Sequence, residues 1–357
     1  MITSILAIDG AAHEGGGQIL RSALALSVVT GKPFRITRIR ANRPKPGLMR
    51  QHLASVEALA KISGAKTEGA ALGSGELVFA PGPARGGEHR FAIGTAGSTM
   101  LVAQALLPAL LVADKPSEIV IEGGTHNPHA PPFEFFAESF LPLLRALGVE
   151  AEATLEEYGF HPAGGGRVRL RVSPWKNRRK VTIGVFDGVP VLSAFALVSN
   201  IPEHIGERET RHLIKGLAAL TPESVSVINA PSPGPGNLLA VRLVKGDRTT
   251  VLSRPGEREI PAGAVAQSVI DQTARMTESP AAVCERLADQ ILVPLAMAGG
   301  GEFVTAGITP HFEANAGVIR QFLPDITITH TREARLQHRV TVEKAAARFS
   351  GISVPRG

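Results

Sequence analysis

An internal repeat is the feature that most restricts how this 357-residue sequence can fold. Three helical patterns, which begin near Arg21, Gln104 and Gln290, resemble one another. The first two end in matched turns, Thr30-Gly31-Lys32-Pro33 and Ala113-Asp114-Lys115-Pro116. Superposition of the three patterns places Arg21, Gln104 and Gln290 at one equivalent helical position. Repeated units of this kind bury their apolar faces against one another, so we expect one shared core.

A strand pattern and a second helical pattern follow each of these helices. The predicted strands are residues 34–39, 118–122 and 302–305, and the predicted second helices are residues 48–62, 133–147 and 316–322. The first two copies continue into β-rich hairpin segments, 66–79 and 151–172. The sequence therefore predicts an α+β or α/β fold in which three β-α-β-α-β-β repeats stack into one large domain.

About ninety residues that do not fit the repeat interrupt the third copy after a strand pattern at 181–185. We expect residues 186–278 to form a smaller inserted α/β domain. Its predicted helices lie near 210–220 and 264–276, its predicted strands near 224–228 and 238–244, and residues 230–236 are a loop by composition. The large domain then comprises residues 1–185 and 279–342, and we expect the polar tail, 343–357, to fray.

Composition narrows the class of protein. Apolar residues make up 44% and charged residues 20% of the chain, which is typical of a globular protein. No apolar run is long enough to span a bilayer, and the N-terminus lacks the pattern of a secretory signal. The single cysteine, Cys284, excludes an internal disulfide framework and favours a reducing compartment, so we expect a cytoplasmic protein. The formal charge of +6 is compatible with nucleic acid binding but is not specific for it.

Three consecutive glycines, 15–17, separate a strand-like segment from a helix-like segment. Glycine allows close approach to a ligand, and the free N–H groups of a helix N-terminus suit an anion. Glu14 does not fit a bare phosphate site unless a cation binds as well, and the alternative is a tight turn with a solvated acid. Residues 94–98 are the equivalent turn of the second repeat, whereas Gly164–Gly166 could form a hairpin turn as readily as a ligand contact.

A basic segment follows the first helix. Seven cations and no acid lie between Lys32 and Arg50. Pro44 and Pro46 keep this segment out of helix, and the next helix begins near Leu48. Cations that converge at a helix N-terminus suit a point-like anion such as a terminal phosphate, and the alternative is a solvated basic loop.

Among eleven histidines, His311 has the most informative context. It follows a strand pattern in the segment 307–311 and stands at the start of the second helix of the third repeat. A histidine there could act as a nucleophile or an acid–base group, and the alternative is a capping or surface residue. The histidines and the lone cysteine show no zinc-binding spacing. The residues alone thus indicate an anion-binding repeat protein without a named reaction.

Over nearly its whole length the chain resembles the RNA 3′-terminal phosphate cyclase family. The most specific match is the segment Tyr158–Val168, YGFHPAGGGRV. Further matches are His13–Arg21, Lys45–His52, Gly94–Ser98, Ala130–Pro132 and Leu287–Gln290. The resemblance implies an ATP-dependent enzyme in which a histidine attacks the α-phosphate of ATP. The adenylyl group then passes to an RNA 3′-phosphate, and the neighbouring 2′-hydroxyl closes a 2′,3′-cyclic phosphate with release of AMP.

The resemblance also implies roles for individual residues. His311 matches the nucleophile, and Glu14 matches a position near a divalent cation, Mg or Mn. The residues that match the RNA-phosphate site are Arg21, Arg40, Arg43, Gln51 and His52. The residues that match the ATP pocket are Gln104, Pro131, Phe135, Asp289 and Gln290. Arg286 lies closest to the place where the family usually has an aromatic residue against adenine, and a guanidinium can also stack on a base.

Two other classes of protein resemble this sequence in general terms and are alternatives to a catalytic cyclase. Non-catalytic relatives that act as RNA-binding ribosome-assembly factors lack the nucleophilic histidine, whereas His311 is present here. Enolpyruvyl transferases have a related repeat but contain six copies. The chain departs from the family at Ala314, where a threonine is commoner. The expected partner is RNA with a 3′-phosphate end, and the sequence leaves open whether the chain forms a homodimer.

Overall fold

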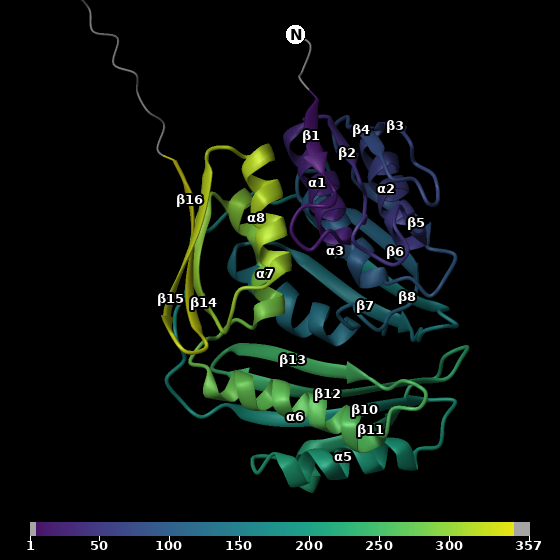
Figure 1. Cartoon of the computed structure of the whole chain (residues 1–357), viewed down its shortest axis with the longest axis vertical. Coiled ribbons are helices and arrows are strands. Elements are labelled where there is room, and N and C mark those ends of the chain that lie inside the picture. The colour runs from purple at the N-terminus through teal and green to yellow at the C-terminus, as the bar shows by residue number, and fades with distance from the viewer. Residues whose placement is uncertain (1–4, 346–357) are drawn as a thin grey trace, which may run out of the picture.

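The computed structural model describes residues 5–345 (Figure 1). The predicted tail, 343–357, therefore lies almost entirely outside the described residues. Its first two residues, Glu343 and Lys344, belong to a strand instead, because the strand pairs with its neighbour as far as Lys344.

Three four-stranded sheets share one strand arrangement. The first contains β1 (Leu6–Asp9), β2 (Phe34–Thr37), β4 (Leu77–Ala80) and β3 (Lys66–Glu68), in this order across the sheet. The second contains β5 (Gly87–Ala92), β6 (Ser117–Gly123), β8 (Gly166–Val172) and β7 (Ala151–Glu157). The third contains β9 (Thr182–Ile183), β14 (Gly300–Thr305), β16 (Gln337–Lys344) and β15 (Ile326–Ala334). In each sheet the first two strands are parallel and the last two form an antiparallel hairpin.

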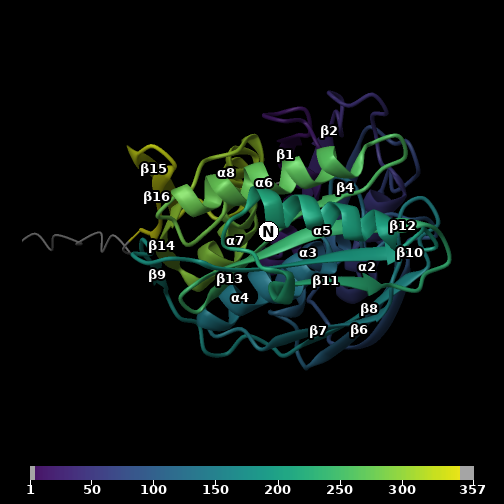
Figure 2. The same ribbon diagram turned by 90° about the horizontal axis from the view of Figure 1, so that it is seen from below.

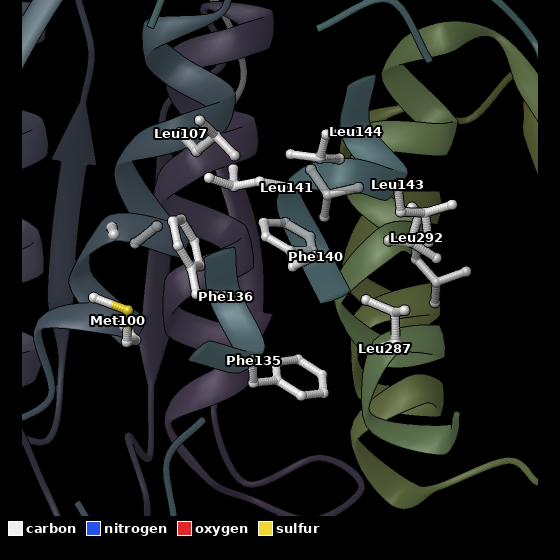
Figure 3. Close-up of a cluster of buried hydrophobic side chains, with 14 of the residues drawn as sticks. Met100, Leu107, Phe135, Phe136, Phe140, Leu141, Leu143, Leu144, Leu287 and Leu292 are labelled. Carbon is white, nitrogen blue, oxygen red and sulfur yellow. The ribbon is translucent and has the colours of Figure 1, made fainter. Parts of the chain in front are cut away.

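Helices between these strands pack together in the interior of the molecule. They are α1 (Gly17–Thr30), α2 (Arg50–Ser63), α3 (Thr99–Leu110), α4 (Leu141–Ala146), α7 (Glu285–Ala298) and α8 (Pro310–Phe322). Helix α1 contacts α2, α3 and α8, so the first and last of these helices lie side by side (Figure 1). Apolar side chains from α3, α7 and the segment before α4 fill the centre; Met100, Phe136 and Leu292 are examples (Figure 3). The buried faces of these helices make one continuous core.

The predicted helix at 133–147 is confirmed in extent, because residues 133–146 are continuously helical, but the middle of this segment is π-helical. A π-helical turn, η1 (Phe135–Phe140), precedes the short helix α4. Phe135, Phe136 and Phe140 all point into the core (Figure 3). A π turn of this kind is a local insertion within an α-helix. The observed helix α8 is longer than the helix predicted at 316–322, because it begins at Pro310.

Residues 191–278 contain a fourth four-stranded sheet and two helices, at the opposite end of the molecule from β1 (Figure 1) and towards the viewer in Figure 2. The elements are β10 (Val191–Ser199), α5 (His204–Gly216), η2 (Pro222–Ser224), β11 (Val225–Asn229), β12 (Gly236–Lys245), β13 (Arg248–Pro255) and α6 (Ala262–Glu278). The strand order is β11-β10-β12-β13, and α5 packs beside α6. Strands β10 and β13 were not predicted from the sequence; β10 is an almost wholly buried apolar run whose pattern does not separate strand from helix.

Glu209 on α5 is a carboxyl group inside this inserted unit. It is 1% exposed, and its Oε2 accepts a hydrogen bond from Nδ2 of Asn237 at 3.0 Å. Burial raises its pKa from the ordinary 4.5 to about 7, although the Asn237 bond opposes this. Between these two pH values the unfolded chain ionises while the folded chain stays protonated, so the contribution to stability falls as the pH rises.

We expect Glu209→Gln to stabilise the protein at pH 8 by about 3 kcal/mol and to have little effect at pH 4.5. The new amide can also donate to Oδ1 of Asn237, which has no hydrogen-bond partner among residues 5–345. The measurement is the free energy of unfolding in urea at both pH values. Glu207→Gln, at an exposed position of the same helix, is the control. An equal effect of Glu209→Gln at both pH values would contradict the burial argument.

Candidate active site

The candidate site lies where the glycine turn before α1 meets the first turn of α8. His311 comes from α8, and Glu14 comes from the turn. Packing of α1 against α8 brings the two residues together although they are distant in the sequence. Nδ1 of His311 lies 3.3 Å from Oε1 of Glu14.

The start of α8 is held by a polar chain that sequence reasoning missed. Thr309 caps the helix, because its Oγ1 accepts a hydrogen bond from the N–H of Phe312 at 3.1 Å. The same hydroxyl donates to Oδ1 of Asp289 at 2.6 Å. The pair Thr309-Pro310 is a recognisable helix start, with a capping residue followed by proline at the first helical position. This start fixes where the half-exposed His311 ring stands.

Glu14 is the most buried charged group of the turn, with 8% of its side chain exposed. Its Oε2 forms an ion pair with Arg43. Burial by itself raises the pKa of Glu14, but the contact with His311 and the charge of Arg43 outweigh it, so the pKa lies below its usual range. In turn, the Glu14 carboxylate raises the pKa of His311 against the opposing effect of burial.

The glycines of the turn make room for functional side chains. A methyl group at position 16 would lie 2.2 Å from a carboxylate oxygen of Glu14, and one at position 17 would lie 2.4 Å from Nε2 of His52. Gly15 has a φ of +59°, a conformation that favours glycine. The three glycines were interpreted from the sequence as room for a ligand. In this structure their immediate neighbours are the protein's own side chains.

Three predicted phosphate-binding residues come from different segments, namely Arg21 from α1, Arg40 from the basic segment and His52 from α2. Burial lowers the pKa of Arg21 to about 10. Burial, with the charges of Arg21 and Arg40, lowers the pKa of His52 to about 3, so this imidazole is neutral at physiological pH. Nη1 of Arg40 donates to the carbonyls of Lys45 and Gly47 at 2.6 and 3.0 Å. Cationic guanidinium groups that lie together without full compensation provide a favourable position for an anion.

Gln51 connects this group of basic residues to the second glycine turn. Its Oε1 accepts a hydrogen bond from the N–H of Ser98 at 3.1 Å, and Ser98 caps α3. A methyl group at position 97 would lie 3.0 Å from Cβ of Gln51, so the glycine there permits the contact. The start of α2 thus faces both turns that the repeat pattern equated, with His52 at Gly17 and Gln51 at Gly97.

The three residues that the sequence placed at one equivalent helical position also converge. Nε2 of Gln104 donates to Oε1 of Gln290 at 2.6 Å, and Arg21 joins them around a small cavity of about 40 Å³. Asn315 lines the same cavity, and its Nδ2 donates to the backbone carbonyl of Asp289 at 2.6 Å. Sequence reasoning missed the role of Asn315, which gives no local signal because all its partners are distant in the chain.

The remaining residues predicted for the ATP pocket differ in accessibility. Asp289 is buried, and burial raises its pKa to about 7 against the Thr309 hydrogen bond. Arg286 is exposed in the first turn of α7, and Pro131 is partly buried. Phe135, in contrast, is 1% exposed and lies with the core side chains of Figure 3, so its ring presents no open face in this structure.

A divalent cation would have few protein ligands here. Within residues 5–345 no group of three or more His, Cys, Asp or Glu side chains is arranged to hold a metal ion. Oε1 of Glu14 is nevertheless buried and has no well-formed hydrogen bond to the described residues. A carboxylate oxygen that faces His311 without a well-formed hydrogen bond fits a cation whose other ligands are substrate phosphates and water.

The fold and the site define an α+β protein in which a histidine in contact with a carboxylate stands beside a cluster of cationic side chains. A family model described as RNA 3′-terminal phosphate cyclase matches residues 12–328. A curated relative of that name from Ectopseudomonas mendocina is 47% identical over 94% of this chain and 98% of its own length. The chain therefore belongs to the RNA 3′-terminal phosphate cyclase family.

Further comparisons agree with this membership. A relative from Koribacter versatilis is 45% identical over 90% of both chains, and one from Ralstonia nicotianae is 47% identical over 92% of this chain and 94% of its own; both are named RNA 3′-terminal phosphate cyclase. Among solved structures, the enolpyruvyl transferase NikO from Streptomyces tendae matches with a TM-score of 0.27 and 19% identity, over 48% of this chain and 33% of its own. This last likeness is too weak to carry an argument.

Across the described residues, no helix combines the length and the apolar character that a membrane span requires.

We expect Glu14→Gln to lower the pKa of His311, because the substitution removes the carboxylate that stabilises the imidazolium form. The measurement is the NMR titration of the His311 ring. Glu313→Gln is the matched control, since Glu313 lies on the same helix but pairs with His330. An unchanged His311 titration in Glu14→Gln would show that the contact does not couple the two groups.

Proposed function

We propose that this protein is an ATP-dependent cyclase that converts an RNA 3′-terminal phosphate into a 2′,3′-cyclic phosphate through a covalent histidine–AMP intermediate. The observation that carries the proposal is the contact of Nδ1 of His311 with Glu14. This contact favours the tautomer whose proton is on Nδ1, so the Nε2 lone pair is free for attack. A nucleophile oriented by a second group is the arrangement that covalent catalysis requires.

In the first step Nε2 of His311 attacks the α-phosphorus of ATP. A nitrogen–phosphorus bond forms, the bond to the bridging oxygen breaks, and diphosphate leaves. The ring then carries a positive charge, which Glu14 stabilises through Nδ1–H. A raised pKa means that the ring must first be deprotonated, so the attack becomes faster as the pH rises through the pKa of His311.

In the second step a 3′-phosphate oxygen of RNA attacks the same phosphorus, and the bond to Nε2 breaks. We propose that Arg21, Arg40 and Arg43 bind this phosphate. Gln51 and His52 would contribute further contacts to the same phosphate. In the third step the 2′-hydroxyl oxygen attacks the terminal phosphorus, the hydroxyl loses its proton, and AMP leaves. Positioning of the phosphate by guanidinium groups supplies the geometry of both displacements.

For the ATP side we propose Gln104, Pro131, Phe135, Arg286, Asp289 and Gln290. Phe135 would contribute by shaping the wall of the pocket, since its ring is buried. Glu14 would hold a divalent cation, Mg or Mn, which when bound offsets the charge of the phosphates. The role of Glu14 would then be double, because the same carboxylate orients His311.

We further propose that the three sheets of identical strand order are copies of one β-α-β-α-β-β unit. Residues 1–185 and 279–342 would then form the catalytic domain, and residues 186–278 the inserted domain. The single buried cysteine, Cys284, supports a cytoplasmic location. The competing proposal of a non-catalytic RNA-binding assembly factor is disfavoured, because such a protein has no need for an oriented histidine next to Glu14.

We expect ATP labelled at the α-phosphate to transfer AMP to the protein in the presence of a divalent cation, and His311→Ala to take up no label. The measurement is label that stays on the denatured protein in base and is released by acid, since a phosphoramidate is labile to acid. His330→Ala is the control, because this half-exposed histidine pairs with Glu313 outside the site. Equal labelling of His311→Ala would remove His311 from the nucleophile's role.

We expect Arg43→Ala to lose cyclisation of 3′-phosphorylated RNA by about 100-fold, since a charge-assisted contact is worth about 3 kcal/mol. Self-adenylylation should fall by much less. The two rates are measured separately. Arg38→Ala is the control, because Arg38 lies in the same basic segment as Arg43 but pairs with Asp9 of β1. If Arg43→Ala lost more self-adenylylation than cyclisation, Arg43 would belong to the ATP site.

A further inference from the structure

A buried contact between a histidine and a glutamate lies at the base of the loop that follows β6. Nε2 of His126 is 2.9 Å from Oε2 and 3.2 Å from Oε1 of Glu134. The His126 side chain is fully buried, and 10% of the Glu134 side chain is exposed. The two residues are eight positions apart, so their contact closes residues 127–133 into a loop. We call this contact the His126–Glu134 clasp.

Neighbouring groups hold the imidazole of the clasp. Its Nδ1 lies 2.8 Å from Oγ1 of Thr125, which also accepts a hydrogen bond from the N–H of Gly159 at 2.9 Å. The ring packs against Tyr158 and Phe160, with ring centroids 5.5 and 5.1 Å away. The His126 end of the clasp is therefore anchored to the connection between β7 and β8.

The loop closed by the clasp has a conformation that local sequence does not favour. His129 has a φ of +61°, which is costly for a residue with a side chain. Such a conformation persists only where the surrounding structure determines it. At the start of the loop, Nδ2 of Asn127 donates to the carbonyl of Ala96, so the loop is also tied to the second glycine turn.

The loop connects the clasp to the proposed ATP pocket. Pro131 lies inside it, and Glu134 is immediately followed by Phe135 at the start of η1. Both ends of the segment that carries Pro131 are thus held by one contact between side chains. A binding wall of this kind works only if its supporting contacts hold it close to the productive geometry.

We infer that His126 and Glu134 are positioning residues that hold the 127–133 loop, and with it Pro131, in the conformation that binds ATP. The inference rests on the proposed function. The clasp acts through the loop, and neither side chain needs to touch the nucleotide. None of the residues proposed for the RNA phosphate lies in the clasped loop, and the loop approaches them only through the second glycine turn, which Asn127 and Gln51 both contact. Loss of the clasp therefore weakens ATP binding much more than the affinity for an RNA 3′-phosphate.

The test compares Glu134→Gln and Glu134→Asp with the wild-type protein. The first removes the charge at nearly constant shape, and the second keeps the charge but shortens the reach. We expect the ATP concentration for half-maximal self-adenylylation to rise by about tenfold or more in Glu134→Gln and by less in Glu134→Asp. The maximal labelling rate and the Kd for a fluorescent 3′-phosphorylated RNA should stay within about twofold of the wild-type values.

Two further measurements separate positioning from a general loss of structure. Glu138→Gln is the matched control, because Glu138 lies on the same helical turn but pairs with Arg242. We expect its ATP dependence to equal that of the wild type. Without ATP, chymotrypsin should cleave after the partly buried Phe133 about tenfold faster in Glu134→Gln than in the wild type, which reports release of the loop directly.

Unchanged ATP dependence in both Glu134 variants, or unchanged cleavage at Phe133, would overturn the inference. So would a loss of RNA affinity equal to the loss of ATP affinity, since that result would indicate general unfolding. Absence of labelling in the wild-type protein would instead count against the proposed function. The two failures are therefore distinguishable.

Discussion

The contact between Glu14 and His311 is the interaction on which the candidate site depends. Glu14 comes from the first turn of the chain and His311 from the last long helix, and they meet only because α1 and α8 pack side by side. The contact shifts the pKa values of the two groups in opposite directions, since it lowers the pKa of the carboxyl and raises the pKa of the imidazole. Both shifts favour the charged form of the group. A change in the packing of these two helices would therefore act directly on the chemistry.

Electrostatic compensation explains how the cationic cluster can exist inside the fold. Arg43 pairs with Glu14, and His52 is kept neutral by burial and by the guanidinium groups of Arg21 and Arg40. A charged histidine at position 52 would add repulsion to a site that already concentrates positive charge. The cluster thus retains its attraction for an anion while it contains only one compensating carboxylate, that of Glu14. The same carboxylate contacts both Arg43 of the cationic cluster and His311, so the two halves of the proposed reaction share one group.

Much of the fold was predictable because its helices have clear apolar periodicity. The predicted helix at 48–62 corresponds to α2, and the predicted helix at 264–276 corresponds to α6, each within about two residues at both ends. The buried strand β10 and the π-helical turn η1 were missed, because a continuous apolar run does not distinguish among strand, helix and widened helix. The clasp was missed for a related reason, since neither His126 nor Glu134 has an unusual neighbourhood in the sequence.

The sequence by itself determined the family, the basic segment, the glycine turns and the identity of His311 as the histidine to examine. It could do so because these features are runs of neighbouring residues or local patterns that recur along the chain. Only the tertiary structure decided that Glu14 faces His311, that Gln104 meets Gln290, and that the glycines of the first turn make room for side chains. These facts are contacts between residues far apart in the chain, and their existence depends on how the helices pack, which no local pattern encodes.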